Sequence, residues 1–378
     1  MRWLVFGTYE AQRHPRVAVL IEGLRAAGDD VIELNAPLGL DTAGRVAMLR
    51  QPWRLPLLVV KLARCWAWLA WRARGYRRPG DVDAVLVGYL GHFDVRLARR
   101  LFPRTPIVLD HLVSAAGTAH DRGLATGGGI KARVMRAIDD GALGSADLVV
   151  VDTTEHAAAL PADAATKGVV ALVGAGREWF AARRQDTSDP AGPLRAIFVG
   201  LYTPLHGTTV LGAALADLAG DGSVEVTMVG TGQDHAECRA AAAGNPRVTW
   251  IDWAAPDELP DLVAGHDVAL GIFGTTDKAR NVVPTKVYQG AAAGCAVLTS
   301  DTTPQRRVLG DAAILVPPGD PAAIATALRS LAADRPALRR WRQAAGRRAD
   351  ECFQAAAVTE PIRHRASSMP TAERVSNR

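Results

Sequence analysis

Short apolar runs recur along the chain, and a longer segment with helical periodicity follows each one. The runs are rich in Val, Ile and Leu at successive positions, a pattern typical of parallel strands that are buried on both faces. In the first half, strands are predicted at residues 3–6, 30–34, 83–87, 106–110, 147–152 and 169–173. This alternation of strand and helix predicts a doubly wound α/β domain.

The same alternation begins again after residue 193. Strands are predicted at residues 194–199, 224–229, 247–251, 267–272, 296–299 and 313–316. Two closing helices are predicted at 321–331 and 337–353, the first with Asp320 as its N-cap and Pro321 at its first helical position. The second half is therefore predicted to form another doubly wound domain.

The segment between the two halves has no strand pattern and ends in turn-forming residues. We therefore expect an N-terminal domain at 1–176, a linker at 177–193, a C-terminal domain at 194–350, and a helix end with a loose polar tail at 351–378. A chain of 378 residues is long enough for two cores. Two such Rossmann-like domains are expected to face each other across a cleft lined by the carboxyl ends of both sheets.

Composition limits the class of protein further. With 48% hydrophobic and 22% charged residues, the chain is neither disordered nor fibrous. The four cysteines lie far apart and form no C-x-x-C pair of the kind found in metal or redox sites. Residues 1–7 enter a strand without the apolar run or cleavage site of a signal peptide. These features predict a cytoplasmic protein.

One predicted helix, at residues 53–78, is rich in tryptophan and in positive charge. On a helical wheel two faces separate: the first holds Lys61, Arg64, Trp68 and Arg72, the second Leu58, Leu62, Cys65 and Leu69. The charges at Lys61 and Arg64 interrupt the apolar run, so a transmembrane helix is not expected. Tryptophan favours the headgroup region of a bilayer and arginine pairs with anionic lipid.

This composition predicts peripheral contact with the inner face of the cell membrane. The residues expected to make the contact are Lys61, Arg64, Trp66, Trp68 and Arg72. A core helix with one solvated face is the alternative.

A basic stretch lies between two predicted strands of the second half, at residues 271–301. It is expected to form a strand, a basic loop, a helix that opens near Pro284, and a further strand. A helix N-terminus attracts phosphate through its free N–H groups and partial positive charge, and Lys278, Arg280 and Lys286 add full charges. Two of the five lysines of the chain lie here. The pattern predicts a diphosphate site, with a solvated basic loop as the alternative.

The second half also carries a series of motifs at the ends of its strands, at residues 198–207, 229–232, 252–253 with 256–259, and 284–294. These motifs resemble those of the retaining nucleotide-sugar transferases of glycosyltransferase family 4, which have the two-Rossmann GT-B fold. The resemblance implies a site for a nucleotide-diphosphate sugar, with no metal and no bound cofactor. Its expected residues in the second half are Tyr202, His206, Gly230, Gly232, Asp252, Lys278, Arg280, Asn281, Pro284, Lys286 and Gln289. Gly7 is added because the basic loop 7–16 follows the first strand and is expected to meet donor phosphates or the acceptor, with an ordinary β-α turn as the alternative.

The sequence departs from the family pattern at two places. The family's Glu-x7-Glu pair falls on Asn281 and Gln289, and a neutral amide binds a ribose hydroxyl more weakly than a carboxylate does. The family's first-loop Arg and Lys fall on Leu201 and His206. The three cations of the 271–301 stretch are expected to replace them.

In the first half, Asp110 and His111 close a predicted buried strand at its carboxyl end. A polar pair in such a place costs desolvation energy unless it is hydrogen-bonded or functional. In family members a histidine at about this place contacts the transferred sugar. The resemblance therefore implies that His111, with Asp110, positions the sugar and activates the acceptor. The alternative is a capping aspartate followed by a hydrogen-bonded histidine.

These features predict a metal-independent, hexosyltransferase-like enzyme. It is expected to move a sugar from a nucleotide diphosphate to an acceptor hydroxyl with retention, the acceptor being a lipid-linked or cell-envelope glycan. A nucleotide-sugar epimerase of the same fold and a catalytically impaired partner subunit are the alternatives. Nucleic acid and NAD are not expected ligands, because no nucleic-acid motif accompanies the basic helix and neither glycine turn is a complete G-x-G-x-x-G.

Overall fold

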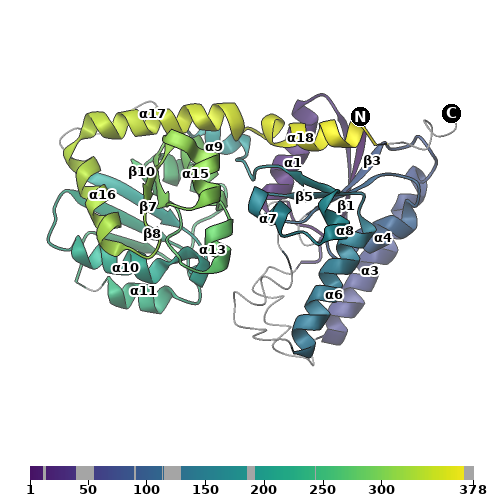
Figure 1. Cartoon of the computed structure of the whole chain (residues 1–378), viewed down its shortest axis with the longest axis horizontal. Helices are drawn as coiled ribbons and strands as arrows, with labels where there is room; N and C mark the ends of the chain where they lie inside the picture. Colours follow the sequence, from purple (N-terminus) through teal and green to yellow (C-terminus); the bar gives the residue numbers. More distant parts are fainter. Residues whose placement is uncertain are drawn as a thin grey trace. The chain divides into compact units, whose positions relative to one another are not determined.

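The computed structural model describes residues 1–11, 14–39, 55–88, 91–112, 114, 129–184, 192–242 and 244–369. Among these residues the chain forms two compact units. The first unit holds the described residues up to Ala171 and those from Val358 onward, and the second holds Leu172–Ala357. Each unit is built on a parallel sheet with helices packed against it (Figure 1).

The sheet of the first unit has the strand order β2-β1-β3-β4-β5-β6. Its strands are β1 (Arg2–Gly7), β2 (Asp30–Asn35), β3 (Ala84–Val87), β4 (Ile107–Asp110), β5 (Leu148–Val151) and β6 (Gly168–Val170). β3, β4 and β5 are buried at every position, which explains their unbroken apolar sequence. The six strands predicted for the first half are all confirmed, with ends that differ by a few residues.

Helices of the first unit cover the sheet in the alternating order that the sequence predicts. They are α1 (Pro15–Ala26), α3 (Leu55–Ala73), the 3-10 turn η2 (Arg74–Tyr76), α4 (Asp94–Leu101), α6 (Ile130–Ser145), α7 (Thr154–Ala158), α8 (Ala162–Ala165) and α18 (Ala355–Ser367). α3, α4 and α6 lie side by side (Figure 1). Their apolar faces share one core with alternate side chains of the strands, such as Leu4 and Phe6 of β1.

The sheet of the second unit has the strand order β12-β11-β10-β7-β8-β9, again all parallel. Its strands are β7 (Leu194–Val199), β8 (Val224–Val229), β9 (Val248–Ile251), β10 (Val268–Leu270), β11 (Ala296–Ser300) and β12 (Ile314–Val316). All six were predicted, and β7 and β8 have the predicted ends. The second doubly wound domain is therefore confirmed.

The second unit carries its helices in the same alternation. They are α9 (Arg177–Ala181), η3 (Pro204–His206), α10 (Thr208–Asp217), α11 (His235–Ala241), α12 (Leu259–Ala264), α13 (Asp277–Asn281), α14 (Thr285–Ala292), α15 (Thr303–Leu309), η4 (Gly310–Ala312), α16 (Pro321–Ala333) and α17 (Arg335–Cys352). Asp320 caps α16 as predicted, its carboxylate accepting the Ala323 N–H at 3.0 Å.

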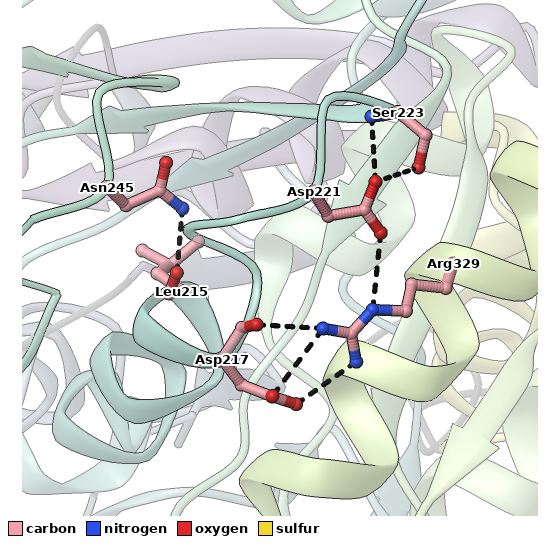
Figure 2. A network of polar contacts seen from close by, with 6 residues as sticks. All are labelled: Leu215, Asp217, Asp221, Ser223, Asn245 and Arg329. Carbon is pink, nitrogen blue, oxygen red and sulfur yellow. Dashed lines mark hydrogen bonds and ion pairs between the residues drawn. The ribbon is translucent and has the colours of Figure 1, made fainter.

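An exposed polar network joins α10 to α16 at the amino edge of this sheet (Figure 2). The guanidinium of Arg329 on α16 donates to the Asp217 carboxylate and carbonyl and, at 3.2 Å, to Asp221. Asp221 also accepts from the hydroxyl of Ser223, just before β8. Asn245 donates to the Leu215 carbonyl at 2.7 Å. The network fixes the packing of these helices on the side of the sheet opposite to the loops discussed below.

The structure divides the chain differently from the expected boundaries in two places. α9 lies inside the predicted linker 177–193 but packs against α12 and α14, because Trp179 is buried there. Residues 185–191 of that linker lie outside the described residues. The predicted loose tail is helical as far as Ser367, and α18 belongs to the first unit from Val358 onward. Residues 370–378 lie outside the described residues.

Candidate functional site

The strand order of the second sheet reverses direction between β7 and β10. In open α/β sheets, ligands bind at the carboxyl ends of the strands that flank such a switch point. The loops that follow these two strands touch, because the Phe273 N–H donates to the carbonyl of His206 at 2.9 Å. The candidate donor site is therefore at the place where the sequence motifs lie.

Two glycines permit the close packing of these loops. Gly207 has a φ of 61°, and a Cβ there would lie 2.3 Å from the Gly274 nitrogen. Gly230, after β8, has a φ of 108°, and its Cβ would lie 2.0 Å from the Gly200 carbonyl oxygen. A side chain at either position is excluded by both conformation and contact. The loops after β7, β8 and β10 thus meet backbone to backbone.

Lys286, in the first turn of α14, places its ammonium group among these loops. The side chain is partly exposed, but its Nζ atom is buried and has no hydrogen-bond partner in the described chain. Nζ lies 3.7 Å from the centroid of the Phe198 ring, and a Cβ on Gly200 would lie 2.7 Å from it. Burial holds the pKa of Lys286 well below its ordinary value. A buried cation without a counter-charge is costly, which indicates a missing anionic partner.

The ring of His206 is under the influence of the charges of both Lys286 and Lys278. Burial lowers the pKa of His206 well below its ordinary value, and the charges of Lys286 and Lys278 lower it further. The Nδ1 atom of His206 accepts the backbone N–H of Thr203 at 3.2 Å, so the neutral ring carries its proton on Nε2. The site therefore combines two lysines with a neutral N–H donor.

The remaining residues predicted for the donor site fall into two groups. Tyr202 is buried with its ring against Phe198, and burial, followed by the charges of Cys238 and Asp252, raises its pKa. Gly232 packs on the carbonyl of Leu201, where a Cβ would lie 1.6 Å from the oxygen. Both belong to the loops around the switch point.

The helix pair α13 and α14 supplies the others. Asn281 ends α13, and Pro284 is the N-cap of α14, which has no side-chain cap. Its first N–H groups are thus left for other acceptors. Arg280 is exposed, and Gln289 lines a small cavity with Trp179, Val199 and Lys286. Gly7 lies in the first unit, at the end of β1.

In the first unit, Asp110 is buried at the end of β4 as predicted, and it is ion-paired. Its Oδ1 lies 3.2 Å from Nε of the equally buried Arg16. Burial raises the pKa of Asp110 above its ordinary value, and the Arg16 charge opposes this. Asp152, after β5, raises it further.

His111 is the next residue, and its backbone N–H donates to the Val150 carbonyl at 2.8 Å. The ring atom Nδ1 is buried and has no hydrogen-bond partner in the described chain. Burial, followed by the nearby His92, lowers the pKa of His111 to about 4. The two rings lie 5.4 Å apart. His111 is therefore a neutral imidazole with a free ring nitrogen.

Sequence reasoning missed three residues at this edge of the first sheet: His92, Asp94 and Asp139. His92 and Asp94 come shortly after the buried strand β3, just as Asp110 and His111 lie at the end of β4. Polar residues at the ends of buried strands are candidates for a site, so this pattern could have identified His92 and Asp94 from the sequence. The Asp94 carboxylate accepts from the Thr8 N–H at 2.7 Å and from the Trp66 indole at 2.8 Å. A Cβ on Gly7 would lie 3.0 Å from this carboxylate, so Asp94 fills the space beside Gly7.

α3 has the two faces predicted for it, with one correction. Leu69 is buried, whereas Lys61, Arg64, Trp68 and Arg72 are exposed. Trp66, which was also predicted to contact the membrane, is half-buried: it packs against the core of the first unit and its indole N–H donates to Asp94. Trp71 is 58% exposed and lies beside the cations instead. Among the described helices, none is long and apolar enough to cross a membrane.

Comparison with known proteins adds to this geometry. Residues 193–334 match the family model described as glycosyl transferases group 1. A search of curated proteins finds no match. HepE from Anabaena in complex with UDP-glucose aligns with 97% of this chain and 99% of its own, at 15% identity and a TM-score of 0.67. The chain has the GT-B glycosyltransferase fold.

Two further solved structures share this GT-B fold. Sucrose-phosphate synthase from Thermosynechococcus elongatus is 15% identical over 97% of this chain and 98% of its own, with a TM-score of 0.67. An α,α-trehalose-phosphate synthase (UDP-forming) from Burkholderia vietnamiensis is 14% identical over 100% and 99%, with the same TM-score. The two-domain α/β architecture predicted from the sequence is thus confirmed.

Proposed function

We propose that this protein is a retaining glycosyltransferase of the family 4 type, which moves a hexosyl group from a nucleotide-diphosphate sugar to an acceptor hydroxyl. The match of residues 193–334 to the glycosyl transferases group 1 model supports sugar transfer. HepE, with the same fold, binds UDP-glucose, which makes UDP-glucose the first donor to test. The nucleotide sugar is the substrate, and no bound cofactor is part of the proposal.

The observation that carries the proposal is the buried, unpartnered ammonium of Lys286. It lies at the start of α14, where free backbone N–H groups and the helix dipole also favour an anion. A diphosphate would supply the missing counter-charge. Lys278, whose charge also acts on His206, and the Nε2–H of His206 are the further donors proposed for this diphosphate.

Such a set fits the chemistry of the departing nucleotide diphosphate. Negative charge develops on the leaving oxygen in the transition state, and preorganised cations and N–H donors stabilise it without rearranging. Lys286 and Lys278 thus do the work for which other enzymes use a metal ion. The departure of the nucleotide diphosphate from the donor sugar is therefore proposed to need no metal ion.

The first unit is proposed to serve the acceptor. His111, with Asp110 beside it, positions and activates the acceptor hydroxyl, because an imidazole with a free ring nitrogen can accept a proton. The exposed cations and tryptophans of α3 favour a lipid-linked or cell-envelope acceptor that is reached at an anionic membrane surface. The protein is accordingly proposed to be cytoplasmic and peripheral at the inner face of the membrane.

The test of the donor site replaces Lys286 by methionine, which keeps the apolar stem and removes the charge. UDP binding, measured by calorimetry, is expected to weaken by roughly 30-fold or more, about 2 kcal/mol. The free variant is expected to unfold at a higher temperature than the parent, because an uncompensated buried charge has been removed.

A matched variant, Lys167→Met in the first unit, is expected to leave UDP affinity unchanged. Unchanged UDP affinity in Lys286→Met would contradict the phosphate assignment.

The type of reaction is tested separately with the parent protein. UDP release that depends on an acceptor supports transfer, whereas conversion of the donor to its C2 epimer would favour an epimerase. Binding without either reaction would favour an impaired partner subunit.

A further inference from the structure

Three potential metal ligands converge at the carboxyl edge of the first sheet. His92 comes from the loop after β3, His111 from the end of β4, and Asp139 from α6. One ligand atom of each lies within 4.8 Å of those of the other two. The three residues are far apart in sequence and form no spaced motif, which is why the sequence predicts no metal site.

The polar atoms of this cluster are poorly satisfied by one another. His92 Nε2 lies 3.2 Å from an oxygen of Asp139, but it makes no hydrogen bond. Nδ1 of His111 is buried and also makes none. A buried polar atom without a hydrogen bond is unfavourable, because it has lost its water without gaining a partner. Two such nitrogens on residues whose ligand atoms cluster with the Asp139 carboxylate indicate a ligand that accepts electron pairs from all three residues.

We propose that His92, His111 and Asp139 form a binding site for a divalent transition metal of the zinc type. Two imidazoles and one carboxylate are ligands that Zn²⁺ and Co²⁺ prefer, whereas Mg²⁺ and Ca²⁺ prefer oxygen ligands. With bonds of about 2.0–2.2 Å, tetrahedral ligands lie roughly 3.4 Å apart. The His92–Asp139 pair already has that separation. Since all three ligand atoms lie within 4.8 Å of one another, no pair has to close by more than roughly 1.4 Å when the metal binds.

The surroundings hold the three ligands in place. The Ser114 hydroxyl donates to the second oxygen of Asp139 at 2.8 Å, as outer hydrogen bonds to metal-binding carboxylates do. The backbone of His111 is fixed to β5 through Val150. Just before His92, the Gly91 N–H donates to the Gly88 carbonyl at 3.0 Å. Three protein ligands leave a fourth position open, which is typical of zinc sites that bind a water or a substrate oxygen.

The inference concerns the first unit alone and goes beyond the proposed sugar transfer. It changes the proposed role of His111 in one respect: a ring nitrogen that binds a metal ion cannot accept a proton, so the metal-bound protein would hold an acceptor oxygen at the open fourth position instead. The full chain, freed of affinity tag and stripped with a chelator, is titrated with Zn²⁺ by calorimetry and with Co²⁺ by visible absorption. One Zn²⁺ per chain and the intense absorption of tetrahedral cobalt are expected. Absence of a one-to-one site in the parent protein would overturn the proposal.

The variants His92→Asn and Asp139→Asn each remove one ligand and keep a polar side chain of similar size. Each is expected to weaken Zn²⁺ binding by at least about 100-fold and to remove the cobalt absorption, and Ser114→Ala is expected to weaken it by about 10-fold. His364→Ala, on the exposed surface of α18, is the matched control and should bind Zn²⁺ like the parent.

Folding of each variant is checked by circular dichroism and by its unfolding temperature, which Zn²⁺ should raise in the parent and in His364→Ala. Equal Zn²⁺ affinity in the parent and both ligand variants would show that the ion binds elsewhere and would refute the site. UDP binding is measured on the same samples. Because the donor site lies in the second unit, the metal site and the donor site can fail separately.

Discussion

At the residue scale, two ionisable side chains of the described chain each have a buried nitrogen without a hydrogen-bond partner. The ammonium group of Lys286 has no hydrogen-bond acceptor, and the neutral ring nitrogen of His111 has no hydrogen-bond donor. An anion would pair with the ammonium group, and a metal ion or an acidic proton would bind the ring nitrogen. The two units therefore carry buried nitrogens that are suited to ligands of opposite character, in agreement with the proposed assignment of the donor to the second unit and of the acceptor to the first.

His111→Ala tests the acceptor side. The variant is expected to lower the transfer rate by about 100-fold or more, which is the usual contribution of a general base. UDP affinity should not change, because His111 lies in the first unit and the donor loops in the second. Steady-state transfer and UDP calorimetry are measured together, with His364→Ala as the control. Full transferase activity in His111→Ala would remove this side chain from the mechanism.

The sequence indicates Lys286 more readily than the metal cluster for a physical reason. Lys286 lies in the first turn of a helix that follows a recognisable strand, so local patterns predict its place. The contact of His92 with Asp139 depends on how β3 and α6 pack in three dimensions, which no local pattern specifies. The side-chain position of Trp66 likewise depends on its hydrogen bond to Asp94, 28 residues away in the sequence.

At the element scale, full burial made the strands predictable. Strands such as β3 and β4 are apolar at almost every position because helices cover both faces. The short helix α9 and the C-terminal helix α18 were missed, since α9 has only five residues and α18 contains Pro361 within a polar sequence. Tertiary packing stabilises both, and local propensity does not reveal it.

Helix α3 gives a prediction at this scale. Arg64 and Arg72 are exposed beside Trp68 and Trp71, so the helix should bind vesicles that contain anionic lipid. The double variant Arg64→Glu with Arg72→Glu is expected to weaken binding by about fivefold or more for each cation lost, near 1 kcal/mol each. Flotation with anionic and neutral vesicles measures the effect.

The control for α3 is Arg347→Glu, which changes an exposed arginine of α17 in the second unit. It is compared with Arg64→Glu alone, so that the net charge changes equally in the two variants. Binding should weaken in Arg64→Glu and stay at the parent level in Arg347→Glu. Equal losses in these two single variants would show that overall charge, and not α3, governs binding. Absence of flotation in the parent protein would count against membrane contact altogether.

At the scale of the whole molecule, both ends of the described chain belong to the first unit. The Asp29 carboxylate accepts the terminal ammonium of Met1 at 2.7 Å, the Trp3 indole at 3.1 Å and Arg363 of α18 at 2.7 Å. Burial raises the pKa of Asp29, but these hydrogen bonds and charges outweigh it and hold the pKa below its ordinary value. The first unit is therefore completed by residues that follow the entire second unit in sequence.

Arg363→Ala tests this closure. Asp29 keeps its other two partners and Arg363 is partly exposed, so the expected loss is about 1 kcal/mol, seen as roughly fivefold faster hydrogen exchange in β1 and α1. Because the folded pKa of Asp29 is lowered, the stabilisation exists above the ordinary carboxyl pKa of about 3.9 and disappears as the pH falls through the folded value. The difference in exchange rate between Arg363→Ala and the parent should therefore shrink in acid.

The control is Arg365→Ala, which changes an exposed arginine on the same helix and should alter the exchange rate less at every pH. Equal effects of the two variants would mean that Asp29 does not anchor α18.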